Sequence, residues 1–117
     1  MPAMRAFILA MTLALPAADA SEADHQRRLC HGMAIEVELP NGARADCLSD
    51  THAIEVDFSE KWAEALGQAL LYAAETDLKP GIFLVCRDEP GNCLAHRLRL
   101  EEAIAKWHLP VDVWAVE

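Results

Sequence analysis

Apolar and polar residues alternate along two stretches of the chain in the way that is typical of half-buried strands. Residues 33–39 read Met-Ala-Ile-Glu-Val-Glu-Leu, and residues 52–58 read His-Ala-Ile-Glu-Val-Asp-Phe. Between them, the Pro-Asn-Gly sequence at residues 40–42 predicts a hairpin turn, because Asn-Gly readily adopts the left-handed backbone of tight hairpins. Residues 43–48 then supply the returning strand. The pattern predicts a three-stranded antiparallel meander over residues 33–58.

The second half of the chain alternates between helical and strand patterns. Residues 59–76 carry apolar side chains at helical spacing, with Ser59 as the predicted N-cap. Residues 82–86, Ile-Phe-Leu-Val-Cys, form a continuous apolar run that indicates a central strand covered on both faces. A second helix is expected over residues 93–107 and a last strand over residues 111–116. The predicted fold class is α/β, a mixed β-sheet in which the meander is followed by helix, strand, helix and strand. We expect three aromatic side chains in its core: Trp62, Trp107 and Trp114.

The first 20 residues have the composition of a secretory signal peptide. Arg5 supplies a positive start, residues 6–15 are apolar, and Ala-Asp-Ala at residues 18–20 is a small-residue cleavage site. The apolar run is too short to span a bilayer. We therefore expect a signal peptide over residues 1–20, a single domain over residues 21–117, a secreted or periplasmic location, and no membrane association after cleavage. An uncleaved membrane anchor is the alternative.

All of the cysteines follow the predicted signal: Cys30, Cys47, Cys86 and Cys93. Cysteines in an exported chain pair as disulfides by default, and four of them allow three pairings. The turn at residues 90–91 favours a short loop closed by Cys86 and Cys93, which leaves Cys30 for Cys47. A zinc site is the competing interpretation, but the cysteine and histidine spacings of zinc motifs are missing from the sequence.

The net charge of −9 restricts the classes of partner. An acidic surface repels nucleic acid and anionic membranes, and it favours cations as ligands. The sequence has no lysine- or arginine-rich run to offset this charge. Nucleic acid is therefore an electrostatically disfavoured partner, and the sequence does not identify a protein partner.

Several polar side chains are expected to meet where the meander joins the first long helix: Asp46, Glu55, Asp57, Lys61, Gln68 and Tyr72. Glu55 and Asp57 are two residues apart on one strand, so they point to the same face. Asp46 lies near the end of the neighbouring strand. The other three are separated by seven and four residues, so they share one stripe of the helix.

Carboxylates gathered in this way indicate a metal site, because clustering them without a cation is costly. The carboxylates of Asp46, Glu55 and Asp57 are hard oxygen ligands that suit Mg²⁺ or Mn²⁺. A bound metal would polarise a phosphodiester and lower the pKa of a water molecule. Lys61 would then orient that water or stabilise the charge that develops on the phosphate.

The order of elements and motifs resembles the PD-(D/E)xK, or restriction-endonuclease-like, nuclease superfamily. That family has an acid on the second strand of its meander and E-x-K on the third, and its RecB-type members add Q-x-x-x-Y on the next helix. Here Asp46 corresponds to the first acid, Glu55 to the second, and residues 68–72 (Gln-Ala-Leu-Leu-Tyr) to the helical motif. Residues 42–72 also resemble a set of small bacterial secreted proteins with this pattern. The resemblance spans residues 36–116 and implies a metal-dependent phosphodiesterase acting on nucleic acid.

Asp57 departs from this pattern, because it occupies the position of the lysine in E-x-K and supplies no positive charge. One hypothesis is that Lys61 replaces that lysine from the helix and that the site is catalytic. The alternative is a non-catalytic binding or interaction domain on a degenerate nuclease scaffold.

Each candidate residue also has a structural interpretation. Glu55 and Asp57 would face solvent if their strand were an edge strand. Lys61 would be a surface lysine, and Gln68 and Tyr72 a structural polar pair under the sheet.

Overall fold

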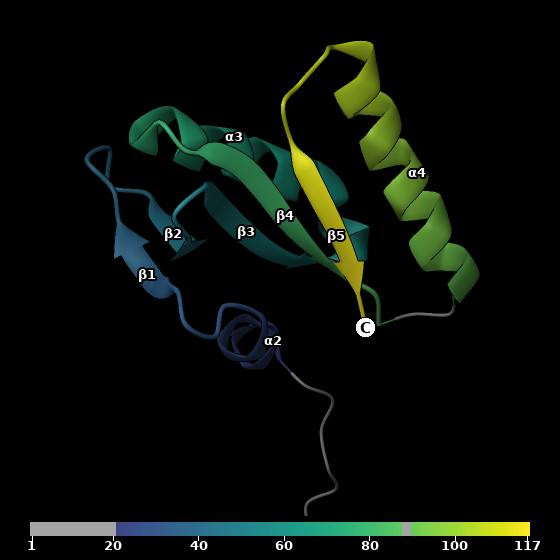
Figure 1. The fold of residues 1–117 in the computed structure, drawn as a ribbon. Coiled ribbons are helices and arrows are strands. Elements are labelled where there is room, and N and C mark those ends of the chain that lie inside the picture. The colour runs from purple at the N-terminus through teal and green to yellow at the C-terminus, as the bar shows by residue number, and fades with distance from the viewer. Residues whose placement is uncertain (1–20, 88–89) are drawn as a thin grey trace, which may run out of the picture.

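The computed structural model describes residues 21–87 and 90–117, which form an α/β domain around one five-stranded sheet (Figure 1). The strands lie in the order β1-β2-β3-β4-β5. Their bounds are Ala34–Glu38 for β1, Arg44–Leu48 for β2, His52–Phe58 for β3, Lys79–Val85 for β4 and Asp112–Val116 for β5. β1, β2 and β3 are antiparallel neighbours, whereas β3, β4 and β5 are parallel. The predicted mixed sheet, with a meander followed by parallel strands, is confirmed.

Helices connect and cover these strands. Their bounds are Glu22–Leu29 for α2, Ser59–Lys61 for the 3₁₀ helix η2, Trp62–Thr76 for α3 and Pro90–Lys106 for α4. Ser59 begins η2 rather than capping the long helix, because its buried hydroxyl is engaged by His96 Nδ1 of α4 at 2.9 Å. No helix within residues 21–87 and 90–117 is long and apolar enough to cross a membrane. The predicted signal peptide lies outside the described residues.

The two faces of the sheet are covered unequally. On one face, which we call the α3 face, β4 residues Ile82 and Leu84 pack with α3 and with Leu100 of α4. On the opposite face, the α2 face, Ile54 and Val56 of β3 pack against the end of α2 and the segment that follows it. In Figure 1, α3 lies behind the sheet and α2 lies below it, so α2 covers only part of its face.

Two disulfides tie peripheral segments to the sheet. Cys30, directly after α2, is bonded to Cys47 of β2 with a Cα–Cα distance of 6.0 Å. Cys86, directly after β4, is bonded to Cys93 in the first turns of α4 with a Cα–Cα distance of 5.5 Å. This is the pairing favoured by the loop lengths. Two disulfides are consistent with an oxidising compartment outside the cytosol.

Two of the three tryptophans are not in the core, so that expectation was wrong for them. Trp107, just after α4, is 72% exposed, and Trp114 of β5 is 37% exposed. The Trp114 ring lies on the part of the α2 face that α2 does not reach, where it contacts the rings of His52 and Phe83 with centroid distances of 5.1 Å. It also covers Gly81 of β4, because the absence of a side chain there leaves room for the indole.

This close approach predicts opposite outcomes for two glycine-to-alanine substitutions. A Cβ at Gly81 would lie 2.8 Å from a ring carbon of Trp114. Gly81→Ala should therefore destabilise the fold by about 1–3 kcal/mol, the usual cost of overpacking. Gly67→Ala, in α3 with no atom within 4 Å of the new Cβ, should stabilise it by about 0.5–1 kcal/mol, because alanine is the better helix former. Urea denaturation of both variants measures the difference, and equal effects would contradict the packing described here.

Candidate functional site: a buried carboxyl cluster

The site begins where β2 and β3 separate. Backbone pairing between these strands is confined to the residues nearest their connecting turn. Further along, the Asp46 carboxylate accepts a hydrogen bond from the Val56 N–H at 2.7 Å. The Asp46 carbonyl accepts another from Gln26 Nε2 of α2 at 3.0 Å. Asp46 thus satisfies backbone groups that the parting strands would otherwise leave unpaired.

Glu55 lies on the α3 face of β3 and is only 6% exposed. The Tyr72 hydroxyl of α3 donates a hydrogen bond to Glu55 Oε1 at 3.2 Å. Burial raises the pKa of Glu55 far above its ordinary value, and the adjacent carboxyl of Asp46 and the charge of Asp57 raise it further. Glu55 is therefore protonated at neutral pH, and its carboxyl O–H donates a hydrogen bond to the Asp46 side chain.

Asp57 points to the same face two residues further along β3 and is 3% exposed. Its Oδ1 accepts a hydrogen bond from the Phe58 N–H at 3.0 Å. Burial, followed by the charge of Glu22, raises the pKa of Asp57 to about 7, against the opposing effects of that N–H and of Lys61. Asp57 is thus partly protonated near neutral pH.

Lys61 does not form an ion pair with any of these three carboxyls within the described residues. Its ammonium lies 3.8 Å from Glu22 Oε2 of α2, and both side chains are about half exposed. An exposed pair of this kind is weak, about 0–1 kcal/mol. Lys61 acts on Asp57 only as a more distant positive charge.

The two α3 residues of the predicted site differ in their environment. Tyr72 is buried and hydrogen-bonded to Glu55. Burial, followed by the neighbouring acids Glu55 and Asp46, raises the pKa of its hydroxyl, so that it stays a donor. Gln68, one helical turn earlier, is half-buried. The structure therefore brings together three carboxyls and one phenol, and leaves Lys61 beside α2.

The expectation that β3 might be a solvent-facing edge strand is excluded. β3 is the central strand of the sheet, and Glu55 and Asp57 are both buried beneath α3. Tyr72 fits the interpretation that it has a structural role, because its ring packs in a core cluster with Ala45 and Ala53.

Sequence reasoning missed the contribution of α2. Gln26 holds the Asp46 backbone, and Glu22 faces both Lys61 and Asp57. The available signal was their spacing of four residues, which places both on one stripe of a short helix. The Ser21 capping box that starts this helix was also visible in the sequence.

Within residues 21–87 and 90–117, no group of three or more His, Cys, Asp or Glu side chains is arranged to hold a metal ion. What the cluster offers is the adjacent, hydrogen-bonded pair Asp46 and Glu55. Two carboxylates can hold Mg²⁺ only when water or substrate completes the coordination.

Comparison of the chain with protein families, with curated proteins and with solved structures finds no match. The resemblance to restriction-endonuclease-like nucleases stays a prediction.

The protonated Glu55 predicts an unusual dependence of stability on pH. The pKa of Glu55 is higher in the folded state than its ordinary value of 4.5, so the folded protein holds a proton that the unfolded chain releases. The contribution of Glu55 is thus complete below about pH 4 and is lost as the pH rises towards the folded-state pKa. Glu55→Gln mimics the protonated acid and does not titrate. Between about pH 5 and 7, its free energy of unfolding should therefore fall by up to about 1.4 kcal/mol less per pH unit than that of the wild type.

Chemical denaturation of wild type and Glu55→Gln across this pH range measures the effect as a difference between two curves. Glu38→Gln, at an exposed acid on β1, is the matched control for the loss of one carboxyl. Parallel stability curves for wild type and Glu55→Gln would show that Glu55 is not protonated in the fold.

Proposed function

We propose that this protein is an exported, non-catalytic binding domain built on a nuclease-like α/β scaffold. The observation that carries the proposal is the composition of the buried cluster, which gathers three carboxyls and no ammonium. Asp57 lies buried where a catalytic lysine would be needed, and Lys61 pairs with Glu22 at 3.8 Å.

Phosphodiester hydrolysis requires positive charge near the phosphate, because negative charge develops on its oxygens as the bond breaks. The cluster supplies the opposite charge, and Glu55 adds a proton rather than a ligand at neutral pH. The net charge of −9 further opposes the approach of a nucleic acid backbone. These features favour a structural role for the acids, which hold the parted strands β2 and β3 to α3.

Export is supported by two independent features. Residues 1–20 have the charge, apolar run and cleavage site of a signal peptide. The two disulfides, which join the sheet to the segment after α2 and to α4, are typical of proteins that fold in an oxidising compartment. A secreted or periplasmic location satisfies both.

A metal-dependent phosphodiesterase is the second candidate, and the convergence of Asp46 and Glu55 favours it. Their oxygens would hold Mg²⁺ or Mn²⁺ together with water, and the metal would polarise the phosphodiester. In that case Lys61 would leave its weak pair with Glu22 and lie near Asp57, whose pKa already responds to it. The two candidate functions share the same fold, so only a measurement of turnover distinguishes them.

Turnover is measured with double- and single-stranded DNA, RNA and bis(p-nitrophenyl) phosphate, each with Mg²⁺ and with Mn²⁺. We expect the wild type to cleave none of them faster than the double variant Asp46→Asn/Glu55→Gln, because the cluster lacks the positive charge that the reaction needs.

Glu22→Gln serves as the sensitised variant, since it releases Lys61 without changing the three carboxyls. It should be as inactive as the wild type. Metal-dependent cleavage that is abolished in the double variant and increased in Glu22→Gln would establish the phosphodiesterase instead.

A further inference from the structure

The two edges of the sheet differ in how well they are protected. In β1, Glu36 has a left-handed φ of 50° and no partner in β2, and both Glu36 and Glu38 are exposed. Distortions and charges of this kind prevent an edge strand from pairing with another chain. β5, Asp-Val-Trp-Ala-Val, pairs with β4 in regular register along its full length and carries neither device at its centre.

The direction of the β5 backbone can be read from one hydrogen bond. The Cys86 N–H donates to the Val116 carbonyl at 2.7 Å, so the backbone groups of Val116 face the β4 side. Backbone groups alternate in direction along a strand, so those of Trp114 face the same way. The N–H and C=O groups of Val113 and Ala115 therefore point outward, and no strand of the described residues lies beyond β5.

We propose that this outer edge of β5 pairs with β5 of a second copy of the chain, antiparallel, about a twofold axis at Trp114. In this register Val113 lies opposite Ala115 of the partner subunit, and each donates to and accepts from the other. Trp114 lies opposite Trp114 of the partner subunit, in the position where side chains of an antiparallel pair come closest. The inference does not depend on whether the carboxyl cluster is catalytic.

The contacts at the two ends of β5 are complementary in an antiparallel pair, which favours a second copy as the occupant. At the start, Asp112 Oδ2 lies 2.7 Å from His52 Nε2 and 3.0 Å from Lys79 Nζ. At the end, Arg28 Nη2 donates to the Glu117 carbonyl at 3.0 Å. Antiparallel pairing places each end beside the opposite end of the other copy, so that Asp112 faces the partner's Arg28. The twofold axis keeps Asp112 and the partner's Arg28 on the same face of the continued sheet, the α2 face. A parallel copy would instead place like charges beside each other.

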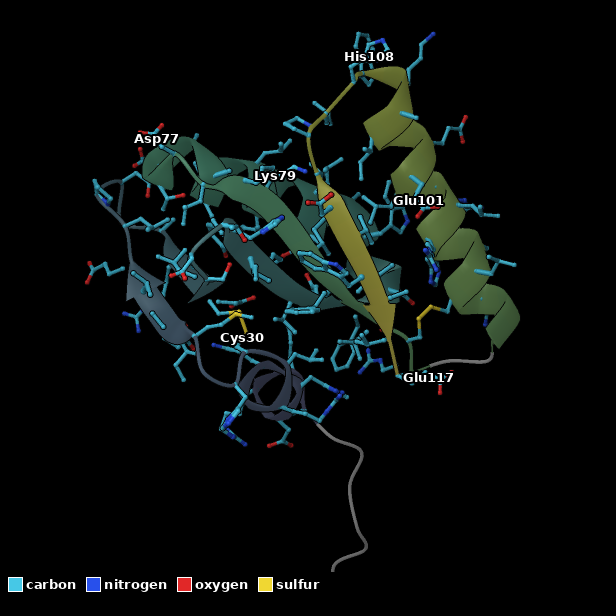
Figure 2. All side chains as sticks on the ribbon, viewed as in Figure 1. Cys30, Asp77, Lys79, Glu101, His108 and Glu117 are labelled. Atoms are coloured by element: carbon cyan, nitrogen blue, oxygen red, sulfur yellow. A yellow bond between two sulfur atoms is a disulfide. The ribbon has the colours of Figure 1, made fainter. Side chains whose placement is uncertain are left out.

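α4 supplies apolar surface at the same margin of the sheet, where it runs alongside β5 (Figure 1). Leu94 is 57% exposed and Leu98 is 55% exposed. They precede Glu101 by seven and three residues and so share its stripe, and Figure 2 shows Glu101 on the side of α4 turned towards β5. A sheet continued through the twofold axis would bring the two α4 helices together and cover these leucines. The apolar surface of these leucines would add to the surface buried by the paired strands, because a short strand pair alone is too small for a stable interface.

The oligomeric state of the wild type is measured by sedimentation equilibrium from about 1 to 300 µM in 0.15 M salt, where charge repulsion is screened beyond about 8 Å. We expect a monomer–dimer equilibrium. Ala115→Pro removes an outward donor and leaves the β4 pairing intact, because proline is tolerated where the N–H of an edge strand faces solvent. It should weaken dimerisation at least tenfold, whereas Ala115→Ser, which keeps the N–H, should not.

The register is tested separately with single cysteines. Trp114→Cys should form a disulfide-linked dimer under mild oxidation, because paired Cα atoms at this position lie about 4.5 Å apart, within disulfide range. Val113→Cys should not, since it faces Ala115 of the partner subunit; peptide mapping identifies the bond and circular dichroism checks each fold. A wild type that stays monomeric at 300 µM would overturn the proposal, and so would a dimer that Ala115→Pro leaves unchanged.

Discussion

The hydrogen bond from the Val56 N–H to the Asp46 carboxylate is the contact on which the rest of the site depends. This hydrogen bond allows β2 to separate from β3 without leaving the buried Val56 N–H unpaired. Glu55 and Tyr72 meet where the two strands separate. A buried unpaired N–H would cost about 1–3 kcal/mol, a large fraction of the stability of a domain this small. The Gln26 contact to the Asp46 carbonyl completes the arrangement from the other side of the sheet.

The same contact explains why an acidic cluster can be buried without a base. Two protein donors, the Val56 N–H and the Glu55 carboxyl, are directed at the Asp46 side chain. Glu55 gives up its charge because burial penalises the ionised form more than any neighbour favours it. The protonated Glu55 adds no second charge beside Asp46, which is much less costly than burying two anions.

Much of this arrangement could be predicted from residue patterns. Alternation along residues 52–58 identified β3 and placed Glu55 and Asp57 on one face, and the hairpin signal at residues 40–42 paired β1 with β2. Tyr72 followed from helical spacing. Lys61 could not be placed in the same way, because a flexible four-carbon side chain at the start of a helix can reach either α2 or β3. In the fold, its ammonium lies 3.8 Å from Glu22 of α2, a residue distant in the sequence.

The sequence by itself determined the main helices and strands after residue 33 and which side of β3 is polar, and it favoured the observed cysteine pairing, because these depend on local periodicity and short loops. Only the tertiary structure decided that β3 is central rather than an edge, that α2 covers just part of its face, and that Trp114 and the α4 leucines stay exposed. Those outcomes depend on strand order and on how far one element overlaps another. Such long-range relations leave no periodic trace in the chain.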